Sequence, residues 1–193
     1  MVLASPIGLY EGLAELVGAT PDAVRQGFWG PHRHAYDEGG SDRTFWEAAL
    51  PLIDGAHVAD LDALLPQLVN ADTNGWREIR PGAREILAEL NGLEAPVYVL
   101  SNAPRHFAES SATFDWRHLV TRFFFSGMLG VAKPDPAIYA AVEEALGLPG
   151  DAFWFIDDKQ ENITTALARG WHAHLWTDDA DTREWLVEEG FLG

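Results

Sequence analysis

Residues 152–158, Ala-Phe-Trp-Phe-Ile-Asp-Asp, decide the fold, because a short apolar run here ends in two carboxylates. A segment with helical character follows at about residues 160–169. Other short apolar runs alternate with helical segments in the same way, at residues 96–100, 123–125 and 171–176. Short apolar strands that alternate with helices are typical of a parallel sheet covered by helices. The second part of the chain is therefore predicted to be an α/β domain with a Rossmann-like parallel sheet.

The first part of the chain has a different pattern, with no alternation typical of strands. Its apolar residues recur at helical spacing from Leu9 onward, and further helices are predicted after Thr20 and Ser41, two good N-caps, and over about residues 57–68. We therefore predict two domains. Residues 9–75 form an all-helical cap insert, and residues 1–8 and 76–193 form the α/β core.

Composition excludes several classes of protein. The 193 residues include 30 acidic and 13 basic ones, for a formal net charge of −17, so neither nucleic acid nor an anionic membrane surface is expected as a partner. Cysteine is absent, which excludes disulfides and thiol catalysis and fits a cytoplasmic location. No apolar stretch is long enough to span a membrane, and the N-terminal residues do not resemble a signal peptide. Nothing in the sequence predicts the oligomeric state.

Polar residues follow the apolar runs at the points where ligands bind in parallel sheets. The first run leads into Ser101 and Asn102, a later segment carries Lys133, and residues 152–156 lead into Asp157 and Asp158. A hydroxyl and an amide donate to phosphate oxygens, lysine neutralises charge on a transferring group, and carboxylates bind Mg²⁺. Each residue alone is commonly structural, but together they predict a metal-assisted phosphoryl-transfer site.

These segments resemble motifs of the haloacid dehalogenase-like (HAD) hydrolase superfamily. Residues 99–102 look like its second motif, residues 130–139 like its third and residues 155–162 like its fourth. The resemblance implies a Rossmann-like core with a small helical cap. The paired aspartates are similar to the phosphatase-like branch rather than to the metal-independent dehalogenases.

The resemblance also implies a role for each matching residue. Ser101, Asn102 and Lys133 would bind phosphate, with Lys133 also bridging to the nucleophile. Asp158 would bind Mg²⁺ directly, Asp157 would orient Lys133 or a metal-bound water, and Asn162, the fifth residue after Asp157, would support that loop.

The first motif of the family, a strand that ends in the nucleophilic aspartate, has no match here. Met1-Val2-Leu3 aligns with residues that should follow it, and the first acidic residue, Glu11, and the first aspartate, Asp22, lie in helical segments. The first core strand is therefore expected to be missing, leaving a gap in the sheet. Two explanations stay open: a shortened enzyme sequence, or a protein that has lost catalysis.

The function expected from the resemblance is Mg²⁺-dependent hydrolysis of a small phosphate monoester, such as a sugar phosphate, through an aspartyl-phosphate. The partner would be a small phosphorylated metabolite. The chain as written would be inactive for lack of the nucleophile. Two alternatives remain: a non-catalytic phosphate- or partner-binding protein of the same fold, and a metal-independent haloacid dehalogenase.

Overall fold

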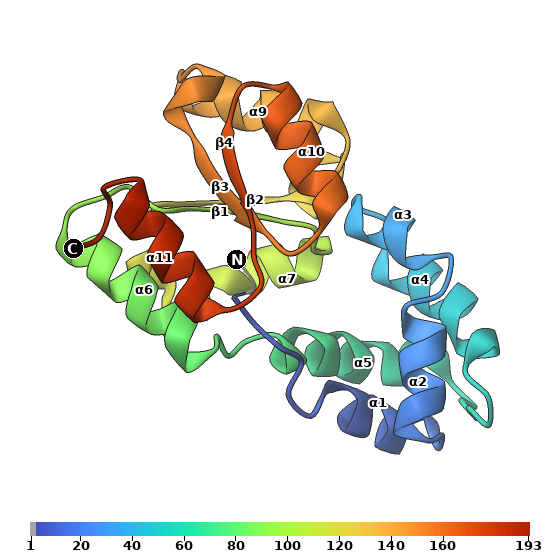
Figure 1. The fold of residues 1–193 in the computed structure, drawn as a ribbon. Coiled ribbons are helices and arrows are strands. Elements are labelled where there is room, and N and C mark those ends of the chain that lie inside the picture. The colour runs from blue at the N-terminus through green and yellow to red at the C-terminus, as the bar shows by residue number, and fades with distance from the viewer. Residues whose placement is uncertain (1–2) are drawn as a thin grey trace.

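The computed structural model describes residues 3–193 and contains a helical cap and an α/β core (Figure 1). The cap helices are α1 (Leu9–Val17), α2 (Pro21–Phe28), α3 (Arg33–Asp37), α4 (Asp42–Ala49) and α5 (Leu61–Gly75), with a 3₁₀ turn at Leu50–Leu52. They enclose an apolar cluster of their own, in which Leu13, Val17, Val24, Trp46 and Leu68 are fully buried. The predicted α/β core with parallel strands and a separate group of N-terminal helices is confirmed. The boundaries at residues 9–75 and 76–193 stay a prediction.

The helix starts in the cap follow the N-caps predicted from the sequence, with one exception. Thr20 accepts from the backbone N–H of Ala23, and Ser41 accepts from that of Thr44. The helix predicted over about residues 57–68 instead begins at Leu61 and continues to Gly75. The Asp60 side chain caps that later start by accepting from the N–H of Ala63.

The core contains four short strands, β1 (Tyr98–Ser101), β2 (Arg122–Phe125), β3 (Trp154–Asp157) and β4 (His172–Leu175). Its helices are α6 (Pro81–Gly92), α7 (Arg105–Ser110), α8 (Ser126–Leu129), α9 (Pro136–Leu146), α10 (Gln160–Ala168) and α11 (Asp179–Glu188). Short 3₁₀ turns lie at Ser111–Thr113, Arg117–Leu119 and Gly150–Ala152. No helix among residues 3–193 combines the length and apolar character needed to cross a membrane.

The four strands form two separate parallel pairs. β1 pairs with β2, with Ser101 opposite Phe125, and β3 pairs with β4, with Asp157 opposite Leu175. Among residues 3–193 no strand joins the pairs, so the predicted gap in the sheet is present. Of the segment that aligns with the residues after the first motif, Met1 and Val2 lie outside the described residues, and Leu3 packs against the cluster around β1.

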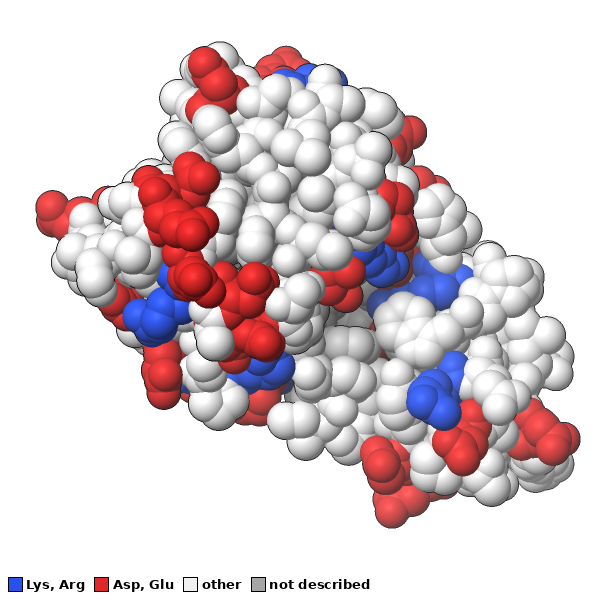
Figure 2. Space-filling model, in the orientation of Figure 1, with Lys and Arg blue, Asp and Glu red and all other residues white. Residues whose placement is uncertain are grey.

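The core helices close around the two strand pairs. Helices α9 and α10 pack with β3 around buried Ile138, Tyr139 and Phe155, while α6 and α11 lie side by side (Figure 1). Acidic side chains are spread over the face shown in Figure 2, and basic side chains border the hollow between core and cap.

Candidate functional site

One cavity of about 630 Å³ collects the polar residues predicted from the sequence. Ser101 ends β1 and Asp157 ends β3, while Lys133 lies in the loop between α8 and α9. All three line the cavity together with Asn102 and Asp158. Asn162 stands behind this wall, 2% exposed. The structure therefore brings together every site residue that the sequence singled out.

Lys133 and Asp157 form an ion pair in the wall of this cavity. The Nζ of Lys133 donates to Oδ2 of Asp157 at 2.6 Å and to the carbonyl of Leu100 at 2.8 Å. Burial would raise the pKa of Asp157, but the Lys133 ammonium and hydrogen bonds from Lys133 and Asn162 outweigh it and lower the pKa. Asp157 is thus ionised at neutral pH and holds the ammonium group at the end of β1.

The second oxygen of Asp157 is held by the start of α10. Its Oδ1 accepts from Nδ2 of Asn162 at 2.7 Å and from the backbone N–H of Lys159 at 3.0 Å. The main chain of Asn162 is held in turn, because its backbone carbonyl accepts from the hydroxyl of Tyr139. Both oxygens of Asp157 are therefore engaged within the chain.

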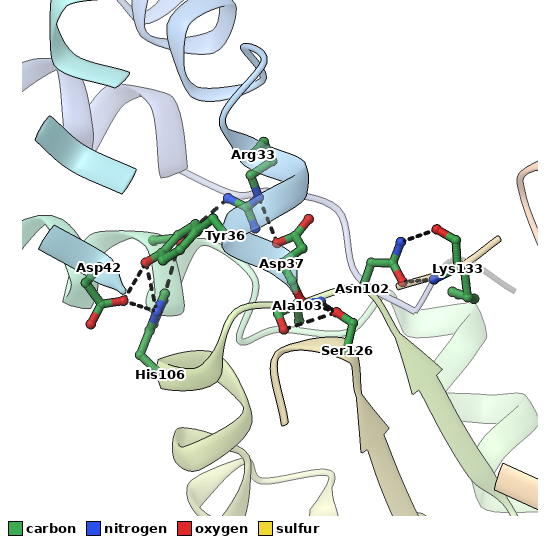
Figure 3. Close-up of polar contacts among 10 residues, drawn as sticks. Arg33, Tyr36, Asp37, Asp42, Asn102, Ala103, His106, Ser126 and Lys133 are labelled. Atoms are coloured by element: carbon green, nitrogen blue, oxygen red, sulfur yellow. Dashed lines mark hydrogen bonds and ion pairs between the residues drawn. The ribbon is translucent and has the colours of Figure 1, made fainter. Parts of the chain in front are cut away.

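Asn102 ties the end of β1 to the loop that carries Lys133. Its Nδ2 donates to the carbonyl of Lys133, and its Oδ1 accepts from the N–H of Lys133, both at 2.8 Å (Figure 3). Unlike Asn102, Ser101 and Asp158 have side chains that make no hydrogen bond or ion pair within residues 3–193. Ser101 and Asp158 thus offer free polar groups to the cavity.

These residues fit a magnesium ion in part. Residues 3–193 contain no group of three or more His, Cys, Asp or Glu side chains arranged to hold a metal. Mg²⁺, however, is commonly held by one or two carboxylates together with water and phosphate oxygens. Asp158 suits that pattern as a hard oxygen ligand, whereas both oxygens of Asp157 already accept hydrogen bonds. A second carboxylate, in addition to Asp158, would give the two protein ligands that such a site can have.

The cap contributes charged side chains that the sequence analysis missed. Arg33, in α3, and Asp72, in α5, line the same cavity and are 7% and 1% exposed. The Nε of Arg33 donates to Oδ1 of Asp37 at 2.9 Å, and its ring neighbours include Phe28. His34, the next residue along α3, is exposed.

His106, near the start of α7 in the core, contacts side chains of the cap. Its Nδ1 lies 3.0 Å from the hydroxyl of Tyr36 and 3.0 Å from Oδ1 of Asp42 (Figure 3). Its Nε2 lies 3.4 Å from Oδ2 of Asp72. Burial would lower the pKa of His106, but Asp42 and Asp72 outweigh it and raise the pKa to about 9. A protonated His106 therefore joins the core to three cap side chains.

Ser126 makes a second junction between cap and core. Its buried hydroxyl donates to the carbonyl of Asp37 and accepts from the N–H of Ala103 (Figure 3). The backbones also approach closely beside it, where Gly39 faces Gly127. The cap is thus seated on the core by specific polar contacts.

The tryptophans divide between packing and the cavity. Trp46 is fully buried in the cap cluster. Trp29, 47% exposed, and Trp76 line the cavity beside Arg33, with their ring centroids 6.1 Å apart. His172 and His174, which share a strand, belong to no metal-binding group among the described residues.

Comparison with known proteins agrees with this architecture. A model of haloacid dehalogenase-like hydrolases matches residues 9–170. Phosphatase MT3486 of Mycobacterium tuberculosis is 32% identical over 64% of this chain and 58% of its own length. Sesquiterpene phosphatase astK of Aspergillus oryzae is 32% identical over 54% of this chain and 55% of its own length. The chain therefore spans less than two thirds of the curated relatives that it matches.

Solved structures share the fold at low sequence identity. A HAD family enzyme, bt-2542, of Bacteroides thetaiotaomicron was crystallised with magnesium and inorganic phosphate. It superposes with a TM-score of 0.69 at 20% identity, covering 91% of this chain and 89% of that one. A predicted HAD-like hydrolase of Porphyromonas gingivalis gives a TM-score of 0.68 at 16% identity, covering 97% and 91%.

Proposed function

Because this chain belongs to the haloacid dehalogenase-like hydrolase family, we propose that its cavity binds a small phosphate monoester and that the parent reaction is Mg²⁺-dependent hydrolysis of that ester. The phosphatase names of two relatives support this reaction class. The observation that carries the proposal is the ammonium of Lys133, fixed between Leu100 and Asp157 at the cavity wall.

The bound phosphoryl group would lie between Ser101 and Lys133. The free hydroxyl of Ser101 would donate to one phosphate oxygen, and the ammonium of Lys133 would neutralise charge on another. Asn102 would act by holding Lys133 in place, because its amide is already paired with the main chain of that residue. Asp157 would orient the same ammonium.

Magnesium would supply further positive charge to the phosphoryl oxygens when bound. Asp158 is the side chain we propose as its ligand, because it lines the cavity and has no partner within residues 3–193. Asp157 is a weaker candidate ligand, since its two oxygens serve Lys133, Asn162 and the Lys159 backbone.

Turnover would need a nucleophile that residues 3–193 do not place at the gap between β1 and β3. In the proposed reaction an aspartate oxygen at that position attacks phosphorus, the bond from phosphorus to the ester oxygen breaks, and the leaving alkoxide takes up a proton. Water then cleaves the aspartyl-phosphate and returns the carboxylate and free phosphate. Without such a carboxylate, we expect binding but no turnover.

The test is phosphate release from an aryl phosphate with Mg²⁺ and with a chelator. We would compare this chain with one extended by about ten residues, a strand that ends in an Asp-x-x-Gly-Gly turn. Release by the extended chain alone, and only with Mg²⁺, supports the proposal. If neither chain turns over although both are folded, the phosphatase function is wrong.

The second candidate is a non-catalytic phosphate-binding protein of the same fold. The absence of a carboxylate between β1 and β3 in the described residues favours it. It predicts Mg²⁺-dependent binding of orthophosphate and no turnover even by the extended chain, so the same experiment separates the two functions.

A further inference from the structure

Two tryptophans of the cap line the cavity that holds the candidate phosphate site. Trp29 directly follows α2 and Trp76 directly follows α5, and their rings meet edge to face. Trp29 is 47% exposed, and neither ring takes part in the contacts that hold Lys133 and Asp157. A large aromatic ring with this much free surface on a cavity wall is available to pack against a bound molecule.

The Trp29 ring is held in one orientation. Its Nε1 donates to the hydroxyl of Tyr10 at 2.8 Å, and the guanidinium carbon of Arg33 lies 5.0 Å from the ring centroid. Phe28 and Trp76 both meet the ring edge to face, with centroids 5.3 Å and 6.1 Å away. Because the indole N–H is already used within the chain, the part of Trp29 that is left for a ligand is apolar ring surface.

The charged side chains beside the two rings offer little to a ligand. Arg33 and Asp72 line the cavity but are only 7% and 1% exposed. Asp37, at 2.9 Å, and Asp72, at 3.7 Å, oppose the charge of Arg33, and His106 lies 3.4 Å from Asp72. The Nε1 of Trp76 is a buried atom as well. The cap side of the cavity therefore presents mainly aromatic surface.

This cap wall is joined to the end of β1 by a short series of contacts (Figure 3). Ala103, just after the strand, donates its N–H to the hydroxyl of Ser126, and that hydroxyl donates to the carbonyl of Asp37. The side chain of Asp37 accepts in turn from Arg33, which lies against the Trp29 ring. The alcohol part of an ester held at the end of β1 would thus extend toward the cap rings.

The chemistry of the cap wall favours an apolar alcohol. A hydroxyl group buried against it would lose its hydrogen bonds to water and find few partners, which costs free energy. Methylene and ring groups have no such hydrogen bonds to lose, and their burial against aromatic faces is favourable.

We propose that Trp29, with Trp76 beside it, binds the alcohol part of the ester, so that the site selects phosphate monoesters of apolar alcohols over those of sugars and other polyols. This inference rests on the proposed function, because it takes the phosphoryl group to lie at Ser101 and Lys133. It departs from the sugar phosphate that the family resemblance implied as an example.

The test is calorimetric titration of the full chain with Mg²⁺ and three probes: orthophosphate, hexyl phosphate and sorbitol 6-phosphate. The two esters have equal numbers of carbon atoms and differ in hydroxyls. We expect hexyl phosphate to bind about ten-fold or more tightly than sorbitol 6-phosphate, the effect of burying about two CH₂ groups. Trp29→Ala should lower this ratio by about three-fold or more and leave the orthophosphate affinity unchanged.

The matched control is Leu52→Ala, in the same cap. Leu52 is 46% exposed, almost the same fraction as Trp29, but it lies outside the residues that line the cavity, so the variant should keep the wild-type ratio. Trp29→Phe keeps an aromatic face and should keep most of the preference. If thermal melting shows that Trp29→Ala is unfolded, Trp29→His replaces it, because it keeps an N–H for Tyr10 while the apolar ring surface is lost.

The outcomes separate this inference from the proposed function. If orthophosphate binds but the wild-type ratio is near one, or favours sorbitol 6-phosphate, the inference is wrong and the phosphate site stands. A ratio that stays unchanged in the folded Trp29→Ala or Trp29→His variant would show that the alcohol part lies elsewhere, and this too would overturn the inference. If none of the three probes binds, the proposed function itself fails, and the inference fails with it.

Discussion

Lys133 and Asp157 are 24 positions apart in the chain, and their Nζ and Oδ2 atoms are joined at 2.6 Å. Their side chains are 10% and 6% exposed, so the pair has little contact with water. A carboxylate at the end of one strand pair therefore fixes an ammonium group at the end of the other. Removing either charge should therefore lower the free energy of unfolding, because the remaining charge would be buried without a partner.

The first prediction concerns Lys133 as a phosphate ligand. Lys133→Met should weaken orthophosphate binding strongly, and in the extended chain it should lower the rate of phosphate release by ~10²–10³-fold, because a positive charge at the phosphoryl oxygens is lost. Binding is measured by calorimetry and release by a phosphate assay. Lys159→Met is the control, since the Lys159 side chain is exposed; equal effects of the two variants would contradict the assignment.

The second prediction uses the contrast between Asp157 and its neighbour. Asp157→Asn should lower the free energy of unfolding by ~3–5 kcal/mol, because it leaves the Lys133 ammonium buried without its counter-charge. Asp158→Asn should change it by less than ~0.5 kcal/mol, since Asp158 is exposed and has no partner within residues 3–193. Urea unfolding measures both. A similar loss in the two variants would show that the ion pair is not the stabilising feature.

The third prediction is that Asp158 carries the metal dependence. We expect the folded Asp158→Asn variant to bind orthophosphate equally with Mg²⁺ and with a chelator, whereas the wild-type chain should bind it more tightly with Mg²⁺. The comparison is made by calorimetry under both conditions. If the variant still responds to Mg²⁺ like the wild type, the metal is held elsewhere.

The positions of the residues at the strand ends could be predicted, because the apolar runs of the sequence show where each strand ends. An apolar run ends in Ser101 and another in Asp157, and parallel strands place their carboxyl ends at one edge. The pairing of Lys133 with Asp157 is one of the two roles that the family resemblance implied for Asp157. The hydrogen bonds of Asn102 to the Lys133 main chain, which hold the loop in place, were not predicted.

The cap side of the cavity could not be predicted in the same way. Arg33 and Asp72 come from two separate cap helices, α3 and α5, and each has a common structural explanation in the sequence. The residues on either side of Arg33, His32 and His34, are both exposed. The helical spacing of Arg33 with Tyr36 and Asp37, all buried, was the available signal for the inward face of α3.

The last prediction concerns the pH dependence of the contact between cap and core. Three groups face the His106 ring: Asp42, Asp72 and the hydroxyl of Tyr36, whose own pKa is raised by burial and by the two carboxylates. The pKa of His106 is raised from 6.5 to about 9. Its protonated form therefore stabilises the fold fully below about pH 6.5, and this contribution is lost as the pH rises through about 9.

We expect the wild-type chain to exceed His106→Gln in free energy of unfolding by up to ~3 kcal/mol more at about pH 6 than at about pH 9.5. Urea unfolding of both proteins at the two pH values measures this difference. The matched control is His118→Gln, which removes an exposed histidine whose Nδ1 lies 2.8 Å from the Asp115 carbonyl. A constant difference for His106→Gln would mean that His106 stays neutral in the folded protein and joins cap to core through uncharged hydrogen bonds alone.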